Sequence, residues 1–218
     1  MIRNDNIINQ VVIDYMYDLY KPLTPRLGEV RDEAEERIIP VILMDTERLL
    51  HTLLAMSRPK RILEFGTAIG YSASCFAEIC GPETEIVTLE ADEKMMQEAQ
   101  RNIDEMGYSD QIQIIFGDAR ETSRNLEGEF DFVFIDAAKS HYLEFWKNIM
   151  KNCHPGTVIV CDNVLLRAKT ASDEYDPKGK FRTHIRHMRE FIDYITNTDE
   201  AVTSVLPAGD GISISVIR

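Results

Sequence analysis

The alternation of apolar and polar positions divides the chain into two parts. In the N-terminal part, apolar side chains recur at helical spacing in three segments. The predicted helices cover residues 7–20, 27–38 and 45–56. Asp45 or Thr46 is suited to cap the third helix, because short oxygen-bearing side chains accept bonds from first-turn N–H groups. From Arg61 onward, short apolar runs alternate with amphipathic segments, which predicts strands that alternate with helices.

The apolar runs predict a seven-stranded sheet. The strands are expected at residues 61–65, 85–90, 111–116, 130–136, 156–163, 201–206 and 211–217. Strands that are separated by helices pair in parallel, which gives a doubly wound, Rossmann-like α/β sheet. A short turn that begins at Pro207 joins the last two strands. This turn is too short for a crossover, so the closing pair should be antiparallel.

Length and composition fit one domain over residues 1–218, with N-terminal helices in 1–57 and the Rossmann-like core in 61–218. The apolar runs stay well below the roughly 18 residues that span a bilayer. The N-terminus also lacks the layout of a signal peptide. We therefore expect a cytoplasmic protein without a membrane segment, in which the cysteines are reduced thiols.

Charge is distributed unevenly along the chain. The net charge of −13 argues against broad, non-specific binding of nucleic acid. The segment 167–189 is nevertheless rich in basic and histidine side chains. They are Arg167, Lys169, Lys178, Lys180, Arg182, His184, Arg186, His187 and Arg189. This basic segment could hold a structured anionic partner, or it could be a solvated helix face.

The first predicted strand runs into a loop that contains two glycines. Gly66 and Gly70 are four residues apart, so the loop differs from the G-x-G-x-x-G pattern that wraps a pyrophosphate. Close backbone approach, helix N–H groups at Ser72 and the carboxylate of Glu64 suit a different ligand. S-adenosylmethionine carries the matching carboxylate, ammonium and sulfonium groups. The alternative is a plain strand-to-helix turn.

Acidic residues also follow the second and third strands. Glu90 lies 24 residues after Gly66, close to the spacing of about 20 residues at which a carboxylate binds ribose hydroxyls. Asp118 is placed to accept a hydrogen bond from an adenine amino group. Alternatively, Glu90 is a solvated strand-end carboxylate and Asp118 caps a helix.

Oxygen donors end the fourth and fifth strands. Asp136 ends the fourth strand, and Asp162 and Asn163 end the fifth. Neighbouring strands lie about 5 Å apart, so two carboxylates and an amide should converge at one edge. This donor set suits a hard cation such as Mg²⁺ rather than zinc. The alternatives are that Asp162 is a cap and that Asp136 only pairs with Lys139.

These motifs resemble the cation-dependent O-methyltransferases, the group that contains catechol and caffeoyl-CoA O-methyltransferases. The resemblance extends from about Ile39 to the C-terminus and rests on LEFGTAIGYS, TLE, GDA, FIDAAK, CDNV and PAGDGISIS. Within the group, GTAIGYSA, FIDAAK, DNVL and the PxGDG turn are most similar to bacterial enzymes that methylate 5-hydroxyuridine at the tRNA wobble position. The resemblance implies the S-adenosylmethionine-dependent methyltransferase variant of the Rossmann-like fold.

The resemblance also implies roles for individual residues. The implied metal ligands are Asp136, Asp162 and Asn163. The implied cofactor contacts are Ile42, Gly66, Ser72, Glu90, Asp118, Ala119 and Asp136. The catalytic residues are expected to be Lys139 and Asp136, and Lys139 would accept the hydroxyl proton or stabilise the oxyanion. Family members commonly form homodimers, so we expect a homodimer here.

The expected reaction is Mg²⁺-dependent methylation of tRNA 5-hydroxyuridine to 5-methoxyuridine. The basic segment, helped by Lys21, Arg26 and Arg31, would hold the anticodon phosphates. A first alternative keeps the catalytic residues but acts on small catechol-like phenols. A second alternative is a non-catalytic nucleotide-binding module on the same fold. The complete set of oxygen donors and Lys139 argues against this second alternative.

Overall fold

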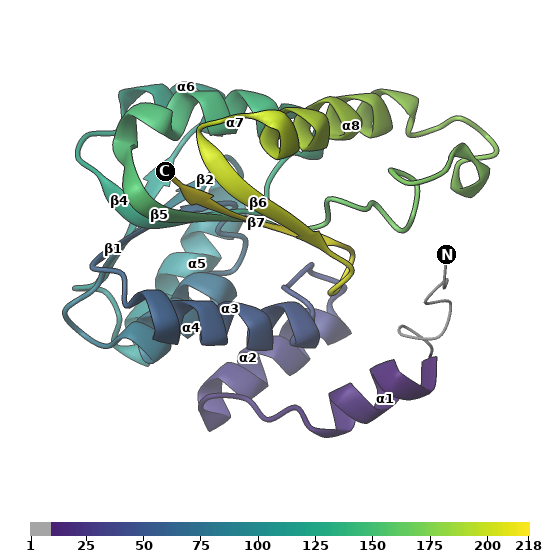
Figure 1. The fold of residues 1–218 in the computed structure, drawn as a ribbon. Helices are drawn as coiled ribbons and strands as arrows, with labels where there is room; N and C mark the ends of the chain where they lie inside the picture. Colours follow the sequence, from purple (N-terminus) through teal and green to yellow (C-terminus); the bar gives the residue numbers. More distant parts are fainter. Residues whose placement is uncertain (1–9) are drawn as a thin grey trace.

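The computed structural model describes residues 10–218, which form a central sheet between two layers of helices (Figure 1). The strands are β1 (Arg61–Phe65), β2 (Glu85–Glu90), β3 (Ile112–Phe116), β4 (Phe130–Ile135), β5 (Cys153–Cys161), β6 (Ala201–Leu206) and β7 (Ile212–Ile217). The helices are α1 (Gln10–Asp18), α2 (Pro25–Glu36), α3 (Met44–Ser57), α4 (Tyr71–Cys80), α5 (Glu93–Met106), α6 (Ala119–Thr122), α7 (Tyr142–Ile149) and α8 (Arg182–Asn197). The predicted helical positions 7–9 lie outside the described residues.

The seven strands lie in the order β3-β2-β1-β4-β5-β7-β6. Neighbours from β3 to β5 pair in parallel, whereas β7 is antiparallel to both β5 and β6. The predicted α/β class and its single antiparallel strand are thereby confirmed. The chain runs from β1 to β2 on one side and returns to the other side of β1 as β4. The carboxyl ends of β1 and β4 therefore flank the switch point at which such sheets bind ligands.

Both faces of the sheet are covered. In β1, Ile62 packs into the core shared with α2, α3, α4 and α5. Leu63 and Phe65 pack into the opposite core, which is shared with α7 and α8. Burial on both faces explains why the strands are continuous apolar runs in the sequence. Among the helices of residues 10–218, none is long and apolar enough to cross a bilayer.

The start of α3 differs from the sequence prediction. The helix begins at Met44, and Leu43 precedes it without a side-chain capping bond, so the prediction of a cap at Asp45 or Thr46 was wrong. The Asp45 carboxylate instead accepts a hydrogen bond from the Gly209 N–H at 2.6 Å. This bond ties the first turn of α3 to the turn that precedes β7.

Candidate active site

A cavity of about 1630 Å³ opens at the carboxyl edge of the sheet. Its walls come mainly from the segments that follow the first five strands and from residues 38–43 before α3. The predicted site residues that line it are Ile42, Gly66, Ser72, Glu90, Asp118, Ala119, Asp136, Lys139, Asp162 and Asn163. Residues that are far apart in the sequence thus meet in one cavity beside the switch point, where this fold binds ligands.

Gly66 allows the tips of β1 and β4 to lie close together. Its φ of 98° is in the region that only glycine adopts readily. A Cβ at this position would lie 2.3 Å from the carbonyl oxygen of Asp136. The Asp136 N–H donates to the Phe65 carbonyl oxygen at 3.0 Å, which fixes the same contact from the other side. The glycine loop therefore positions a predicted metal ligand as well as the cavity wall.

Glu64 lies behind this loop and is fully buried. Its carboxylate accepts hydrogen bonds from the hydroxyls of Ser72 and Thr88, each at 2.5 Å. Burial raises the pKa of Glu64 to about 7, and the two hydroxyl donors oppose this shift. Ser72 lines the cavity but Glu64 does not, so Glu64 supports the wall from behind. Its contact with a cofactor stays a prediction.

Glu90 lines the cavity at the end of β2 and orders the surrounding backbone. One carboxylate oxygen accepts from the Ala68 N–H at 2.8 Å. The other accepts from the N–H groups of Ala91 and Asp92, both at 2.8 Å. These bonds hold the carboxylate in a fixed orientation beside the glycine loop. A ribose would meet an ordered acceptor there rather than a freely rotating side chain.

Asp118 combines the two roles that the sequence left open. Its carboxylate accepts from the Arg120 N–H at 2.9 Å and caps the short helix α6, and it also lines the cavity. The Arg120 guanidinium pairs with it and lowers the pKa of Asp118 to about 2. The carboxylate is therefore ionised over the whole physiological range. Ala119, the next residue, lines the same part of the cavity.

Asp136, Asp162 and Asn163, which follow β4 and β5, line the same cavity, and their role as metal ligands stays a prediction. Ile135 and Cys161 are paired at the ends of these parallel strands, so the next residues, Asp136 and Asp162, are neighbours. The Asp162 N–H donates to the Ile135 carbonyl oxygen at 3.0 Å and continues the pairing. Asn163 follows with a φ of 57°, a left-handed turn that asparagine tolerates better than most residues. We call Asp136, Asp162 and Asn163 the acidic corner.

The electrostatics of the acidic corner fit a hard divalent cation. Asp162 is only 2% exposed, and burial followed by the charge of Asp136 raises its pKa. Two carboxylates held together with little access to water repel each other unless a cation lies between them. Lys139 supplies one positive charge, because its Nζ donates to Asp136. The ion pair that the sequence left as an alternative thus forms, and it does so within the acidic corner.

Lys139 is held by a second contact. Its Nζ donates to the Tyr142 hydroxyl at 3.1 Å, and that hydroxyl donates to the Asp162 carbonyl oxygen at 2.9 Å. Tyr142 is fully packed at the start of α7. The lysine is therefore anchored at the wall between both strand tips, and its ammonium lies in the cavity beside the carboxylates.

Sequence reasoning did not single out Asp210, and it assigned Arg167 and Arg31 only to phosphate binding. Arg167 and Asp210 line the cavity, and the Arg167 N–H donates to the Asp210 carboxylate. Arg31 is 3% exposed, forms an ion pair with Glu47 and donates to the Tyr71 hydroxyl at 3.1 Å. The only available signal was Arg31 itself, a charged residue at a core-facing position of the predicted helix 27–38. Its assignment to phosphate binding was wrong because the side chain is buried.

Comparison with known proteins decides the family. The O-methyltransferase family profile matches residues 23–217. The chain belongs to this family. A catechol O-methyltransferase from Niastella koreensis is 33% identical over 175 residues, which are 78% of this chain and 79% of that protein. A caffeoyl-CoA O-methyltransferase from Eucalyptus gunnii is 26% identical over 92% of this chain and 85% of its own length.

Solved O-methyltransferase structures share the fold. A methyltransferase from Podospora anserina bound to SAH superposes with a TM-score of 0.87 at 25% identity and covers 100% of both chains. An O-methyltransferase from Bacillus cereus in complex with SAH gives 0.82 at 26% identity, over 95% of this chain and 97% of that one. The protein is an S-adenosylmethionine-dependent O-methyltransferase of the catechol and caffeoyl-CoA type.

Proposed function

We propose that this O-methyltransferase requires a divalent cation, Mg²⁺ by preference, and methylates one of two adjacent oxygen atoms of its substrate. The observation that carries the proposal is the acidic corner, in which Asp136 and Asp162 lie side by side with Lys139 against them. Asp136, Asp162 and Asn163 would hold the cation through oxygen atoms. Such a donor set leaves positions for water and substrate, as Mg²⁺ prefers.

The chain's own residues would carry the remaining steps. A bound cation would lower the pKa of the hydroxyl that is to be methylated. Lys139 lies beside Asp136 and could act in one of two ways. As the neutral amine it would accept the hydroxyl proton at Nζ, and as the ammonium it would stabilise the resulting negative charge. Glu90 and Asp118 would orient the ribose and adenine of the cofactor, and the first turn of α4 would hold its carboxylate. Fixing both reactants in line contributes much of the rate.

The first test is metal removal. The chelator-treated enzyme should lose methyl transfer to a catechol probe and regain it when Mg²⁺ is added. An Asp162→Asn variant should show no such recovery, because the buried carboxylate has become neutral. Asp131→Asn is a matched control, since Asp131 lies at the opposite end of β4. Full activity of the chelated wild type would contradict the proposed metal dependence.

Two substrate classes fit this chemistry. The catechol O-methyltransferase relative supports a small phenol with vicinal hydroxyls. The apolar wall formed by Ile38, Pro40 and Leu43 is compatible with an aromatic ring. The alternative substrate is 5-hydroxyuridine at the tRNA wobble position, whose 5-hydroxyl and 4-carbonyl are also adjacent. Exposed basic groups of the basic segment support this second class.

Only part of the basic segment 167–189 is available to bind an RNA, because some of its side chains make contacts within the protein. Arg189 donates to the Thr170 carbonyl oxygen at 2.8 Å and pairs with Asp173, so it braces its own loop. Lys169 packs against the Phe181 ring. Of the remaining members, Arg167 also lines the cavity. Apart from Arg189, the exposed lysine and arginine residues of the segment are Arg167, Lys178, Lys180, Arg182 and Arg186.

A parallel assay separates the two substrates. The enzyme, S-adenosylmethionine and Mg²⁺ are incubated either with tRNA that carries 5-hydroxyuridine or with a catechol, and products are measured by mass spectrometry. Arg182→Glu with Lys180→Glu should abolish tRNA methylation and spare the catechol if tRNA is the substrate. No 5-methoxyuridine from the wild type, with efficient catechol methylation, would select the phenol.

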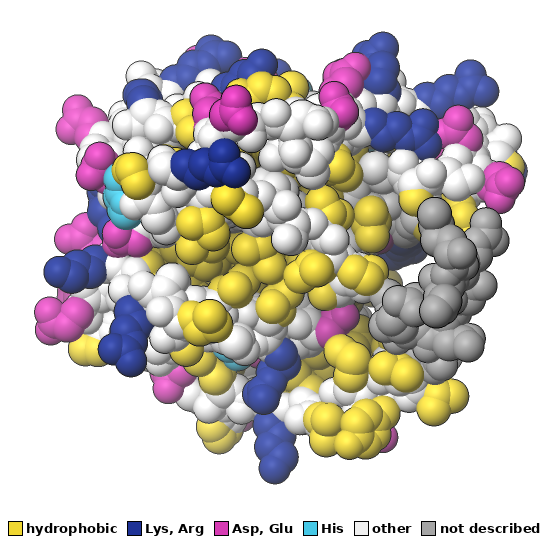
Figure 2. Space-filling view, viewed as in Figure 1, with side chains coloured by type: hydrophobic (Ala, Val, Ile, Leu, Met, Phe, Trp, Pro, Cys, Tyr) yellow, Lys and Arg dark blue, Asp and Glu magenta, His cyan; other side chains and the backbone are white. Residues whose placement is uncertain are grey.

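We also propose a homodimer. β6 is an edge strand of the sheet, and its Val202 and the cross-strand partner Val216 on β7 are 57% and 40% exposed. Figure 2 shows hydrophobic side chains across the middle of this face, where β6 and β7 run. A second copy that covered them would remove apolar surface from water. Sedimentation should give a dimer for the wild type and a monomer for Val202→Lys; a monomeric wild type would contradict the proposal.

A further inference from the structure

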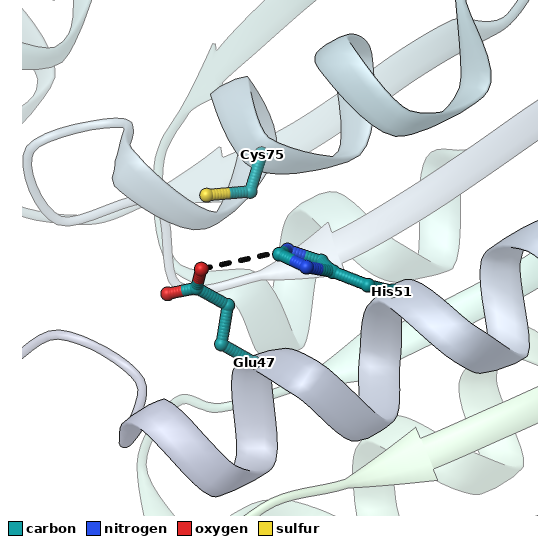
Figure 3. A group of neighbouring side chains, drawn as sticks. All are labelled: Glu47, His51 and Cys75. Atoms are coloured by element: carbon teal, nitrogen blue, oxygen red, sulfur yellow. Dashed lines mark ion pairs between the residues drawn. The ribbon is translucent and has the colours of Figure 1, made fainter. Parts of the chain in front are cut away.

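A buried group of three metal-ligand side chains lies between α3 and α4, away from the acidic corner. Glu47 and His51 are one turn apart on α3, and Cys75 projects toward them from α4 (Figure 3). One ligand atom from each side chain lies within 4.8 Å of the other two. All three side chains are buried. Among residues 10–218, no other group of His, Cys, Asp and Glu side chains comes this close.

His51 is the member of this group whose polar atoms are buried but not paired. Its side chain is 8% exposed, yet neither ring nitrogen has a hydrogen-bond partner. Nε2 lies 3.6 Å from the Glu47 carboxylate, which is too long for a hydrogen bond. Buried polar atoms are almost always paired, so an orphaned imidazole needs a partner. Burial lowers the pKa of His51, which leaves a neutral ring with a free lone pair.

Glu47 is oriented by residues outside the group. Its Oε2 accepts from Arg31 and from the Tyr71 hydroxyl at 2.7 Å. Its Oε1 faces His51 and accepts from the Tyr20 hydroxyl at 3.0 Å. A carboxylate ligand that is held through its other oxygen by a second shell is typical of metal sites. Arg31 brings a positive charge, which the carboxylate and an ionised Cys75 would together outweigh.

We propose that Glu47, His51 and Cys75 bind a zinc-type divalent cation. Zinc takes carboxylate oxygen, imidazole nitrogen and thiolate sulfur at about 2.0–2.3 Å, so its ligand atoms lie a few ångströms apart, as here. Three protein ligands leave a fourth position for water. On binding, the Cys75 thiol releases its proton to solvent and the thiolate bonds to the ion.

The chemistry of the zinc-type site differs from that of the acidic corner. The acidic corner offers oxygen alone, which favours Mg²⁺, whereas sulfur and imidazole favour zinc. The site would cross-link α3 to α4, whose first residue, Tyr71, lines the substrate cavity. Bound zinc should therefore stabilise the fold. It would do so whether or not the acidic corner binds Mg²⁺.

Cobalt titration tests the proposal on the full chain. Co²⁺ is added to the Asp162→Asn protein, in which the acidic corner is weakened, and absorption is followed. We expect one equivalent to bind with a thiolate-to-cobalt charge-transfer band. Cys75→Ser should remove the band, and His51→Gln should weaken binding by about 100-fold or more. Cys80→Ser, which changes another thiol on the same helix, should leave the band unchanged.

X-ray absorption of wild-type protein loaded with one equivalent of zinc covers the case in which Cys75→Ser fails to fold. We expect one sulfur neighbour at about 2.3 Å and nitrogen or oxygen neighbours at about 2.0–2.1 Å. A shell without sulfur would overturn the proposal. A cobalt charge-transfer band that persists in folded Cys75→Ser, or the absence of any band in the parent protein, would overturn it as well.

Discussion

The Arg31 guanidinium donates a hydrogen bond to the Ile42 carbonyl oxygen at 2.9 Å, so a buried cation on α2 holds the backbone at the cavity wall. The same guanidinium pairs with Glu47, which is fully buried. Arg31→Ala would leave that carboxylate without its cation. We expect a loss of about 3–5 kcal/mol in the free energy of unfolding, measured by urea denaturation.

An arginine on the surface provides the control for this prediction. Arg37 pairs with Glu98 at the surface, where the Arg37 side chain is half exposed to water. Arg37→Ala should leave the urea midpoint nearly unchanged, because exposed ion pairs contribute little to stability. If Arg31→Ala and Arg37→Ala lowered the free energy of unfolding equally, burial of the Arg31–Glu47 pair would not increase its contribution to stability.

Gly66→Ala should disrupt the cavity in addition to the loss of stability that any replacement of a left-handed glycine causes. Gly66 and Gly156 share a φ of 98°, but an added Cβ meets the Asp136 carbonyl oxygen at 2.3 Å only in the first case. At Gly156 nothing lies within 4 Å. Both variants should lose about 1–2 kcal/mol from the left-handed backbone. Calorimetric titration should show loss of S-adenosylmethionine binding in Gly66→Ala but not in Gly156→Ala. Similar affinities of the two variants for S-adenosylmethionine would show that the close approach of Gly66 to Asp136 does not shape the binding site.

The stability of the protein should depend on pH because Glu64 titrates at different pH values in the folded and unfolded chains. Its pKa is about 7 in the folded chain and returns to its ordinary value of 4.5 on unfolding. Between these values the folded state holds a proton that the unfolded chain has lost. The stability contribution is therefore complete below pH 4.5 and declines as the pH rises to 7. Relative to Glu64→Gln, the metal-free wild type should lose up to about 3 kcal/mol between pH 5 and 7.5.

The comparison uses urea denaturation of both proteins at each pH. Taking the difference between wild type and Glu64→Gln cancels the titration of other groups. An unchanged difference from pH 5 to 7.5 would mean that the Ser72 and Thr88 hydroxyls already keep Glu64 ionised at low pH.

The sheet and the acidic corner could be predicted from the sequence because both depend on local pattern plus one general rule. Apolar runs mark strands, and the carboxyl ends of parallel neighbours meet at one edge. That rule alone brings Asp136 and Asp162 together. The capping of α3 could not be predicted, because Asp45 bonds to Gly209, which is 164 residues away in the sequence.

The buried polar contacts escaped the sequence for a related reason. The helical pattern places Arg31 on the core-facing side of its helix but does not show which groups it meets there. It also does not bring Cys75 to His51 on another helix. The hydrogen bonds of Glu64 to Ser72 and Thr88 also join different elements, and its place at a strand end did not predict them. Such contacts depend on tertiary packing between elements, which periodicity does not encode.

Lys139→Ala should separate chemistry from binding. The lysine Nζ donates to Asp136 and, at 3.1 Å, to the Tyr142 hydroxyl. Its removal takes away a proton acceptor if the amine acts in its neutral form, or a positive charge if it acts as the ammonium. Turnover should fall by about 10²–10⁴-fold, the usual contribution of a general base. Affinity for S-adenosylmethionine should change little, and Mg²⁺ should bind at least as tightly because the competing ammonium is gone. Activity of the variant should rise with pH as the substrate hydroxyl ionises without help. Two outcomes would show that Lys139 is only a structural partner of Asp136. One is turnover of Lys139→Ala at the wild-type rate. The other is a loss of turnover that a higher pH does not restore, together with weaker Mg²⁺ binding.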